Sequence, residues 1–82
     1  MDNDNERHEH HTVYFVNGER QTTGAHELDV KAILAHAGFD PVTDYRLTRD
    51  EGNHVYTDYD QDVPIHDGER FTATYVGPTP TS

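Results

Sequence analysis

The stretch Thr12–Thr23, TVYFVNGERQTT, decides the predicted fold. It begins with β-branched and aromatic residues, which favour an extended strand. The pair Asn17-Gly18 follows directly. Both residues tolerate the positive φ angles that a type I′ turn requires at its two central positions, so the pair is a strong hairpin signal. We therefore predict a hairpin in which Glu19–Thr23 is the returning strand.

The first strand of this hairpin is apolar on both of its faces. Either Val13 and Phe15 or Tyr14 and Val16 point toward the core, and alternation alone leaves the choice open. Whichever pair is left outside forms an apolar strip on an otherwise acidic surface.

An amphipathic helix is predicted after the hairpin. Asp29 suits the N-cap position, because its carboxylate can accept hydrogen bonds from the first amides of the helix. Gly38 stands where a left-handed C-terminal cap is wanted, and Pro41 prevents continuation. About nine residues are helical in this interpretation, which is too few for a stable isolated helix, so packing must hold it. The apolar stripe consists of Val30, Ile33, Leu34 and Ala37.

Further extended segments follow the helix. Tyr45–Thr48 is predicted to be a strand, and a polar turn separates it from His54–Tyr59, which can also be extended. Val63–Ile65 is short and contains a proline, which suits an edge strand. Phe71–Val76 is the last strand. Its inward residues are expected to be Phe71, Ala73 and Tyr75.

The order hairpin, helix, strand, short strand, long strand predicts the fold class. One helix packed across one face of a mixed sheet is an α+β arrangement, and this order makes it a β-grasp with four to five strands. We expect one domain over residues 12–76, with flexible segments at 1–11 and 77–82. The residues predicted to line the core are Ile33, Leu34, Leu47, Ile65 and Phe71.

Composition narrows the classes of function. The chain has 16 Asp and Glu against six Lys and Arg, and its formal net charge is −10. Nucleic acids and anionic membranes bind basic surfaces, so neither is an expected partner. The absence of cysteine excludes disulfides, thiolate metal sites and thiol nucleophiles. No run approaches 18 apolar residues and the N-terminal segment is acidic and polar, so we expect a cytoplasmic protein rather than a secreted or membrane-spanning one. We expect it to be a monomer.

The acidic composition has two explanations. A generic acidic protein carries such a surface for solvation. In a salt-adapted organism, a surface rich in carboxylates and poor in lysine keeps a protein soluble in concentrated salt. Lys31 is the only lysine of the chain, and we favour the second explanation, a halophile.

Four short segments resemble the prokaryotic ubiquitin-like family known as the multiubiquitin domain. They are FVNGERQ (15–21), LDVKAILAHAGFDP (28–41), YRL (45–47) and HDGERF (66–71), in the order and spacing of the family. This resemblance implies a ubiquitin-like β-grasp fold. It also implies protein partners, namely homologues of ubiquitin-activating and conjugating enzymes or a JAB-type deubiquitinating peptidase.

The C-terminal segment differs from that of activated ubiquitin-like modifiers, which is slim and usually ends in two glycines. Gly77 is the only glycine after the last strand, and Pro78–Ser82 follow it. If the protein is conjugated, we expect Gly77 to be the residue joined, after removal of Pro78–Ser82. Lys31 is then the only side-chain acceptor for building chains. Alternatively, the domain acts by non-covalent binding and the segment is a frayed end.

Two segments contain residue types that bind metals, but neither predicts a site. The run His8–His11 offers three imidazoles and a carboxylate in a segment expected to be flexible, without a second group of ligands nearby. Residues 58–62 read D-x-D-x-D, like the start of a calcium loop, and Glu69 falls at the twelfth position. The sixth position of such a loop requires glycine and is Val63 here. No metal or cofactor is therefore expected.

No catalytic function is predicted either. The sequence has no Ser, His and Asp at the spacing of a nucleophile elbow and no glycine-rich phosphate loop. We predict a non-enzymatic ubiquitin-like modifier or adaptor. The first alternative is a sulfur carrier of the same fold, which also needs a terminal glycine carboxylate. The second is a stand-alone interaction module that uses its exposed sheet face.

Overall fold

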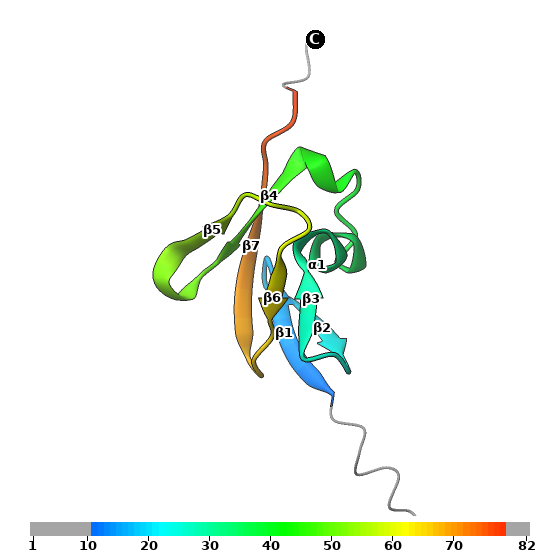
Figure 1. Ribbon diagram of the computed structural model, residues 1–82, viewed down its shortest axis with the longest axis vertical. Helices are drawn as coiled ribbons and strands as arrows, with labels where there is room; N and C mark the ends of the chain where they lie inside the picture. Colours follow the sequence, from blue (N-terminus) through cyan, green and yellow to red (C-terminus); the bar gives the residue numbers. More distant parts are fainter. Residues whose placement is uncertain (1–10, 79–82) are drawn as a thin grey trace, which may run out of the picture.

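The computed structural model describes residues 11–78, in which one α-helix lies across a twisted β-sheet (Figure 1). No helix in this described part of the chain is long and apolar enough to cross a membrane. The elements are β1 (Thr12–Val16), β2 (Glu19–Thr23), β3 (Glu27–Asp29), α1 (Val30–His36), the 3-10 turn η2 (Val42–Asp44), β4 (Tyr45–Arg49), the 3-10 turn η3 (Glu51–Asn53), β5 (His54–Tyr56), β6 (Asp62–Pro64) and β7 (Glu69–Tyr75).

The main sheet has five strands in the order β2-β1-β7-β4-β5. The central pair, β1 and β7, is parallel, whereas the other neighbouring strands are antiparallel. The first and last strands of the domain therefore lie side by side at its centre (Figure 1). This confirms the predicted α+β class with a mixed five-stranded sheet and one helix, and the topology is compatible with a β-grasp.

A second, two-stranded sheet pairs β3 with β6. The short strand expected at residues 63–65 is therefore present as β6, but its partner β3 was not predicted from the sequence. The segment Glu27–Asp29 has a single apolar residue, Leu28, which pairs with the buried Val63. Because such a short segment carries no alternation, only its partner strand makes it extended.

Turn residues hold both ends of the parallel β1/β7 pair. At one end, the Asn17 side chain accepts a hydrogen bond from the Ala73 amide at 2.9 Å and donates one to the Ala73 carbonyl at 3.2 Å. At the other end, the Asp67 carboxylate accepts from the Val13 amide at 2.9 Å, and the Gly68 amide donates to the Val13 carbonyl. Asn17 and Gly68 both have positive φ, at 54° and 84°. The Asn-Gly and Asp-Gly pairs thus extend the parallel ladder beyond the strands themselves.

We expect Asn17→Gly to destabilise the domain, even though glycine tolerates the same backbone conformation. The substitution removes both hydrogen bonds to Ala73 and leaves its partly buried amide and carbonyl unpaired, which costs about 1–3 kcal/mol. Asn53→Gly is the matched control, because Asn53 also has positive φ (51°) and no side-chain hydrogen bond to it is present in residues 11–78. Urea midpoints of the two variants compare them directly, and equal midpoints would contradict the role of the Asn17 side chain.

The core settles which face of β1 points inward. Tyr14 and Val16 are 0% and 1% exposed, so Val13 and Phe15 form the outer strip. All five predicted core residues are confirmed as buried. The complete core of the described residues is Tyr14, Val16, Val30, Ile33, Leu34, Leu47, Tyr56, Val63, Ile65, Phe71 and Ala73.

The helix is shorter than predicted, with seven residues rather than about nine. Its start is confirmed, since the Asp29 carboxylate accepts from the Ala32 amide at 2.9 Å. Its C-terminal cap is also at the predicted residue, Gly38, although the last helical residue is His36. Gly38 has a φ of 91°, and the Phe39 amide donates to the Leu34 carbonyl at 2.9 Å. This Schellman-type closure uses the last carbonyls of the helix and ends it one turn before Pro41.

Two strands differ in extent from the prediction. Strand β5 ends at Tyr56, so only the first half of the segment His54–Tyr59 is in the sheet. Strand β7 begins earlier than predicted, at Glu69. Tyr75 is on the same face as Phe71 and Ala73, as the alternation predicts, but it is 48% exposed and not part of the core. Tyr75 lies at the end of the β4/β7 ladder, beside the partly buried Tyr45, and the two rings pack edge to face at 5.5 Å.

Candidate functional site

The predicted conjugation residue, Gly77, is packed against η2. The Val76 amide donates to the Asp44 carbonyl at 2.7 Å, and the Tyr75 hydroxyl donates to the Pro78 carbonyl at 2.6 Å. A Cβ atom at Gly77 would lie 2.7 Å from Asp44 Cγ and 2.9 Å from the Tyr75 hydroxyl. These distances are shorter than a carbon atom tolerates, so a side chain at position 77 would require the Asp44 carboxylate and the Tyr75 hydroxyl to move.

The absence of a side chain at position 77 lets the Asp44 carboxylate and the Tyr75 hydroxyl lie against the backbone, which is a local role for Gly77 apart from conjugation. A C-terminus that is to be activated has to be slim and accessible, whereas hydrogen bonds of Val76 and Pro78 anchor the segment around Gly77. Residues 79–82, whose removal the modifier hypothesis requires, lie outside the described residues. Conjugation through Gly77 stays a prediction.

Lys31, the predicted acceptor, lies in the first turn of α1. Its ammonium group contacts the Asp60 carboxylate and lies 3.3 Å from Asp29 Oδ2. Hydrogen bonds to Asp60 and Asp29 raise the pKa of Lys31 above its ordinary value. Isopeptide formation needs the neutral amine, so these two carboxylates make Lys31 a poorer nucleophile than a free lysine. Lys31 is in α1, whereas Gly77 follows the end of β7.

Removal of the Asp60 carboxylate is expected to make Lys31 more reactive. The raised pKa of Lys31 depends first on its hydrogen bond with Asp60, so Asp60→Asn increases the neutral fraction of the amine at any pH below that pKa. Acylation by an N-hydroxysuccinimide ester, mapped to Lys31 by peptide mass, should therefore be faster between about pH 7 and pH 9. Glu51→Gln makes the same charge change on an exposed residue outside this contact and should leave the rate unchanged. Equal rates in wild type and Asp60→Asn would contradict the proposed effect.

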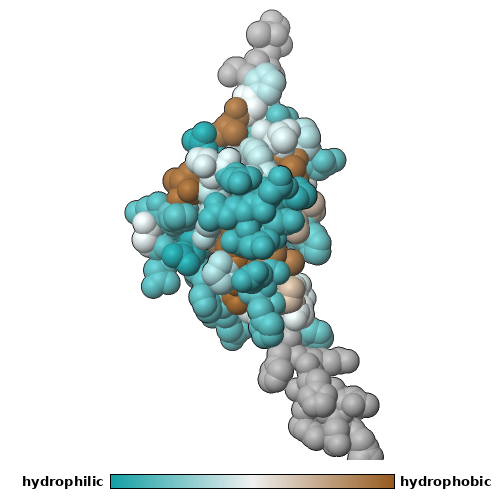
Figure 2. Space-filling model, in the orientation of Figure 1, coloured by the Kyte–Doolittle hydropathy of each residue, from teal (hydrophilic) through white to brown (hydrophobic). Residues whose placement is uncertain are grey.

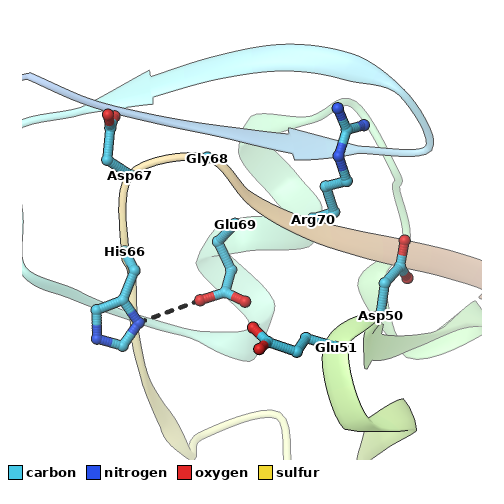
Figure 3. Close-up of a pocket in the computed structure, with 7 residues that line it drawn as sticks. All are labelled: Asp50, Glu51, His66, Asp67, Gly68, Glu69 and Arg70. Carbon is cyan, nitrogen blue, oxygen red and sulfur yellow. Dashed lines mark hydrogen bonds and ion pairs between the residues drawn. The ribbon is translucent and has the colours of Figure 1, made fainter.

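A shallow cavity of about 310 Å³ lies beside the turn that leads into β7 (Figure 3). Glu69 points into it from the core face of β7, with a side chain that is only 6% exposed, and its Oε1 is 3.1 Å from His66 Nδ1. The next residue, Arg70, points to the other side of the strand (Figure 3). The cavity is lined by Asp50, Glu51, His66, Asp67, Gly68, Glu69 and Arg70.

This cavity offers little chemistry beyond the His66–Glu69 pair. Its lining contains no Ser, Thr, Cys or Lys that could act as a nucleophile beside that pair. The Asp50 carboxylate already accepts a hydrogen bond from the Thr72 hydroxyl at 2.7 Å. Across residues 11–78, no three His, Asp or Glu side chains gather as metal ligands, and the run His8–His10 lies outside the described residues.

The sheet face opposite α1 is covered by no helix or strand of residues 11–78. Strand partners share a face and residues alternate along each strand, so the register defines which side chains point there. They are apolar residues, threonines and arginines, and none is acidic. We call this surface the open sheet face, and it consists of Val13, Phe15, Arg20, Thr22, Arg46, Thr48, Val55, Arg70, Thr72 and Thr74.

The composition of the open sheet face is unusual for this chain. Carboxylates outnumber Lys and Arg by 16 to six in the chain, and Figure 2 shows a surface that is mainly hydrophilic with scattered apolar residues. On the open sheet face, the Arg70 guanidinium lies 4.7 Å from the centre of the Phe15 ring, and Val55 is 45% exposed. Phe15 and Val13 are the apolar strip that the sequence left as one of two possibilities.

Known proteins provide no identity for the chain. No family model, curated protein or solved structure matches it. The multiubiquitin resemblance therefore stays a prediction that depends on four short segments. Two of these segments contain Asn17, Asp67 and Gly68, which hold the β1/β7 pair. Their conformations are accounted for by the fold, so these two segments do not by themselves indicate a function.

Sequence reasoning did not find the arginines of the open sheet face. A signal was present, because in Tyr45–Arg49 and Glu69–Tyr75 the arginines Arg46 and Arg70 alternate with the buried residues. In β2, however, no residue is fully buried. The face of the sheet to which Arg20 points therefore follows only from its pairing with Phe15.

Proposed function

We propose that this domain is a non-enzymatic, ubiquitin-like adaptor that binds protein partners through its open sheet face. The observation that carries the proposal is the chemistry of that face. Its strands contribute arginine, threonine and apolar side chains and no acidic residue, and the Asp50 carboxylate reaches it from the following turn to accept a hydrogen bond from Thr72. Arginine and aromatic residues are enriched at protein interfaces, and charge is depleted at their centres. The family resemblance suggests homologues of ubiquitin-activating or conjugating enzymes, or a JAB-type peptidase, as partners.

Two features favour an adaptor over a covalent modifier. The backbone around Gly77 is anchored by hydrogen bonds and packs tightly on Asp44 and Tyr75. The Lys31 amine is engaged by Asp29 and Asp60, which keep it charged. Neither feature prevents conjugation, but each has to be undone before the corresponding group can react.

Site-specific photo-crosslinking in the cells that encode the protein tests the binding face. A crosslinking residue at Thr74, on the open sheet face, should capture a defined protein partner that mass spectrometry identifies. The same residue at His36, which is exposed on α1, is the matched control and should capture that partner far less. Equal capture from both positions, or capture only from His36, would refute the open sheet face as the binding surface.

Intact mass separates the adaptor from the modifier. The adaptor hypothesis predicts a population without adducts whose C-terminus retains the residues after Gly77. Adducts joined through Gly77 would contradict the adaptor hypothesis and support the modifier hypothesis. A thiocarboxylate at that position would favour the sulfur carrier.

A further inference from the structure

Three strands place two arginines and a phenylalanine in one row across the open sheet face. Phe15 of β1 pairs with Arg20 of β2 on one side and with Arg70 of β7 on the other. Strands are about 4.8 Å apart, so the α-carbons of the two arginines are separated by roughly 10 Å. The Arg70 guanidinium stacks on the ring at 4.7 Å, which restricts it to a position above the sheet.

A third arginine lies farther along the same face. Arg46 of β4 pairs with Thr74, which is four residues beyond Arg70 on β7. At about 3.3 Å per residue, the positions of Arg70 and Arg46 along the strand direction differ by about 13 Å. Thr72 lies on β7 between them, with its hydroxyl bonded to the Asp50 carboxylate, and Thr74 lies beside Arg46.

These guanidinium groups are not neutralised within the described part of the chain. Its ion pairs involve Lys31 with Asp29 and Asp60, and His66 with Glu69, but no arginine. The Asp50 carboxylate also reaches this face, where it accepts a hydrogen bond from Thr72 and forms no ion pair with an arginine. In a chain of net charge −10, three arginines that no carboxylate of residues 11–78 pairs with are available for carboxylates of another molecule.

We propose that the open sheet face binds an extended acidic segment of a partner protein, with one carboxylate on Arg70 and a second, four residues away, on Arg46. This inference rests on the proposed adaptor function and specifies the chemistry of its partner. In an extended chain, residues i and i+4 point to the same side and are about 13 Å apart, which matches the arginine spacing. Arg20 and Phe15 lie beside Arg70 on the neighbouring strands β2 and β1, and they widen the site there.

An acidic protein segment fits the surface better than a nucleic acid does. Nucleic-acid affinity depends on neutralising many phosphates along a continuous backbone. Here the open sheet face has only three arginines, Arg20, Arg46 and Arg70, and a longer polyanion would meet the carboxylates that surround it. A short segment with two spaced carboxylates contacts only the arginine face and avoids that repulsion.

Titration with synthetic peptides, followed by backbone amide chemical shifts, tests the proposal. The probe is a nine-residue peptide, Gly-Ser-Glu-Thr-Val-Thr-Glu-Ser-Gly. The comparison peptides replace both glutamates by glutamine or place them next to each other. The first peptide should shift amides of Phe15, Arg70, Thr72 and Thr74, and both comparison peptides should bind at least about fivefold more weakly. All titrations use one KCl concentration at which every variant has a native amide spectrum.

Protein variants identify the arginines responsible. Arg70→Gln and Arg46→Gln should each weaken binding about five- to tenfold. Lys31→Gln makes the same charge change on the helix side and should alter it less than twofold. The double variant Arg46→Glu/Arg70→Glu should no longer bind the glutamate peptide. It should instead bind a peptide in which lysine replaces both glutamates.

The outcomes separate this inference from the proposed function. Equal binding of the glutamate and glutamine peptides, or equal effects of Lys31→Gln and Arg70→Gln, would overturn the acidic partner. If ten-nucleotide oligothymidylate binds as tightly as the glutamate peptide, the partner of this face is a nucleic acid and not an acidic protein segment. If the peptide experiment fails while Thr74 still crosslinks a protein in cells, the adaptor function stands and only the acidic partner is wrong.

Discussion

Leu34→Ala is expected to lower the free energy of unfolding by about 2–5 kcal/mol. Leu34 is 0% exposed at the centre of the face that α1 turns to the sheet. Its removal leaves a cavity between the helix and core residues such as Leu47 and Phe71, because a small core relaxes only partly around the missing atoms. A single domain has only about 5–15 kcal/mol of stability in total, so this loss is a large part of it. Urea unfolding followed by circular dichroism measures the change.

His36→Ala is the matched control for this prediction. His36 is in the same helix but is exposed, so its truncation should change stability by no more than about 0.5 kcal/mol. If Leu34→Ala and His36→Ala have the same urea midpoint, the packing of α1 on the sheet contributes far less than the structure implies. If the Leu34 variant is unfolded in dilute buffer, both proteins are compared in molar KCl.

The unfolding temperature of the wild-type domain is expected to rise steeply with salt. Sixteen acidic residues face six Lys and Arg, and within residues 11–78 no arginine is paired with a carboxylate. Repulsion among these charges opposes the compact state. It acts over about 30 Å at 0.01 M salt but only about 3 Å at 1 M. A gain of about 2 kcal/mol would raise the midpoint by roughly 8–16 °C for a domain of this size.

A charge-reduced variant distinguishes screening from general stabilisation by salt. Glu19, Glu27 and Glu51 are exposed, and their side chains form no ion pair among residues 11–78. Replacing all three with glutamine should raise the midpoint in dilute buffer and flatten its dependence on KCl. A wild-type midpoint that is flat or falls toward molar salt would contradict the halophile interpretation.

Salt also affects the proposed binding of acidic segments, in the opposite direction. Distant charges are screened in molar KCl, but a guanidinium and a carboxylate in direct contact are closer than the Debye length of about 3 Å. Contacts with Arg46 and Arg70 should therefore weaken with salt without disappearing. A salt-adapted adaptor would depend on such contacts and on the apolar side chains around Phe15.

Turn and cap residues of the fold could be predicted from the sequence alone. The hairpin at Asn17-Gly18, the N-cap Asp29 and the left-handed Gly38 all have the predicted conformations. These features depend on the φ preference of one residue or on hydrogen bonds to residues a few positions away, as in the bond between Asp29 and Ala32. The core positions of α1 were predictable for the same reason, because helical periodicity is also local.

The choice between partners distant in the chain was decided only by the tertiary structure. Alternation could not show that Tyr14 rather than Phe15 is buried, because both strand faces are apolar and only the position of α1 distinguishes them. The role of Asn17 extends beyond its turn, since its side chain bonds a backbone 56 residues away.

The candidate sites show the same division. The sequence identified Gly77 because it is the last glycine, and Lys31 because it is the only lysine. The structure added that Gly77 is packed on Asp44 and that Lys31 is held by Asp60. The arginine row depends on the pairing of β2, β1 and β7, which brings Arg20 and Arg70 to one face. Residue type and local spacing therefore determined the elements and their caps, whereas long-range pairing decided the binding face, because a surface is formed by residues from several strands at once.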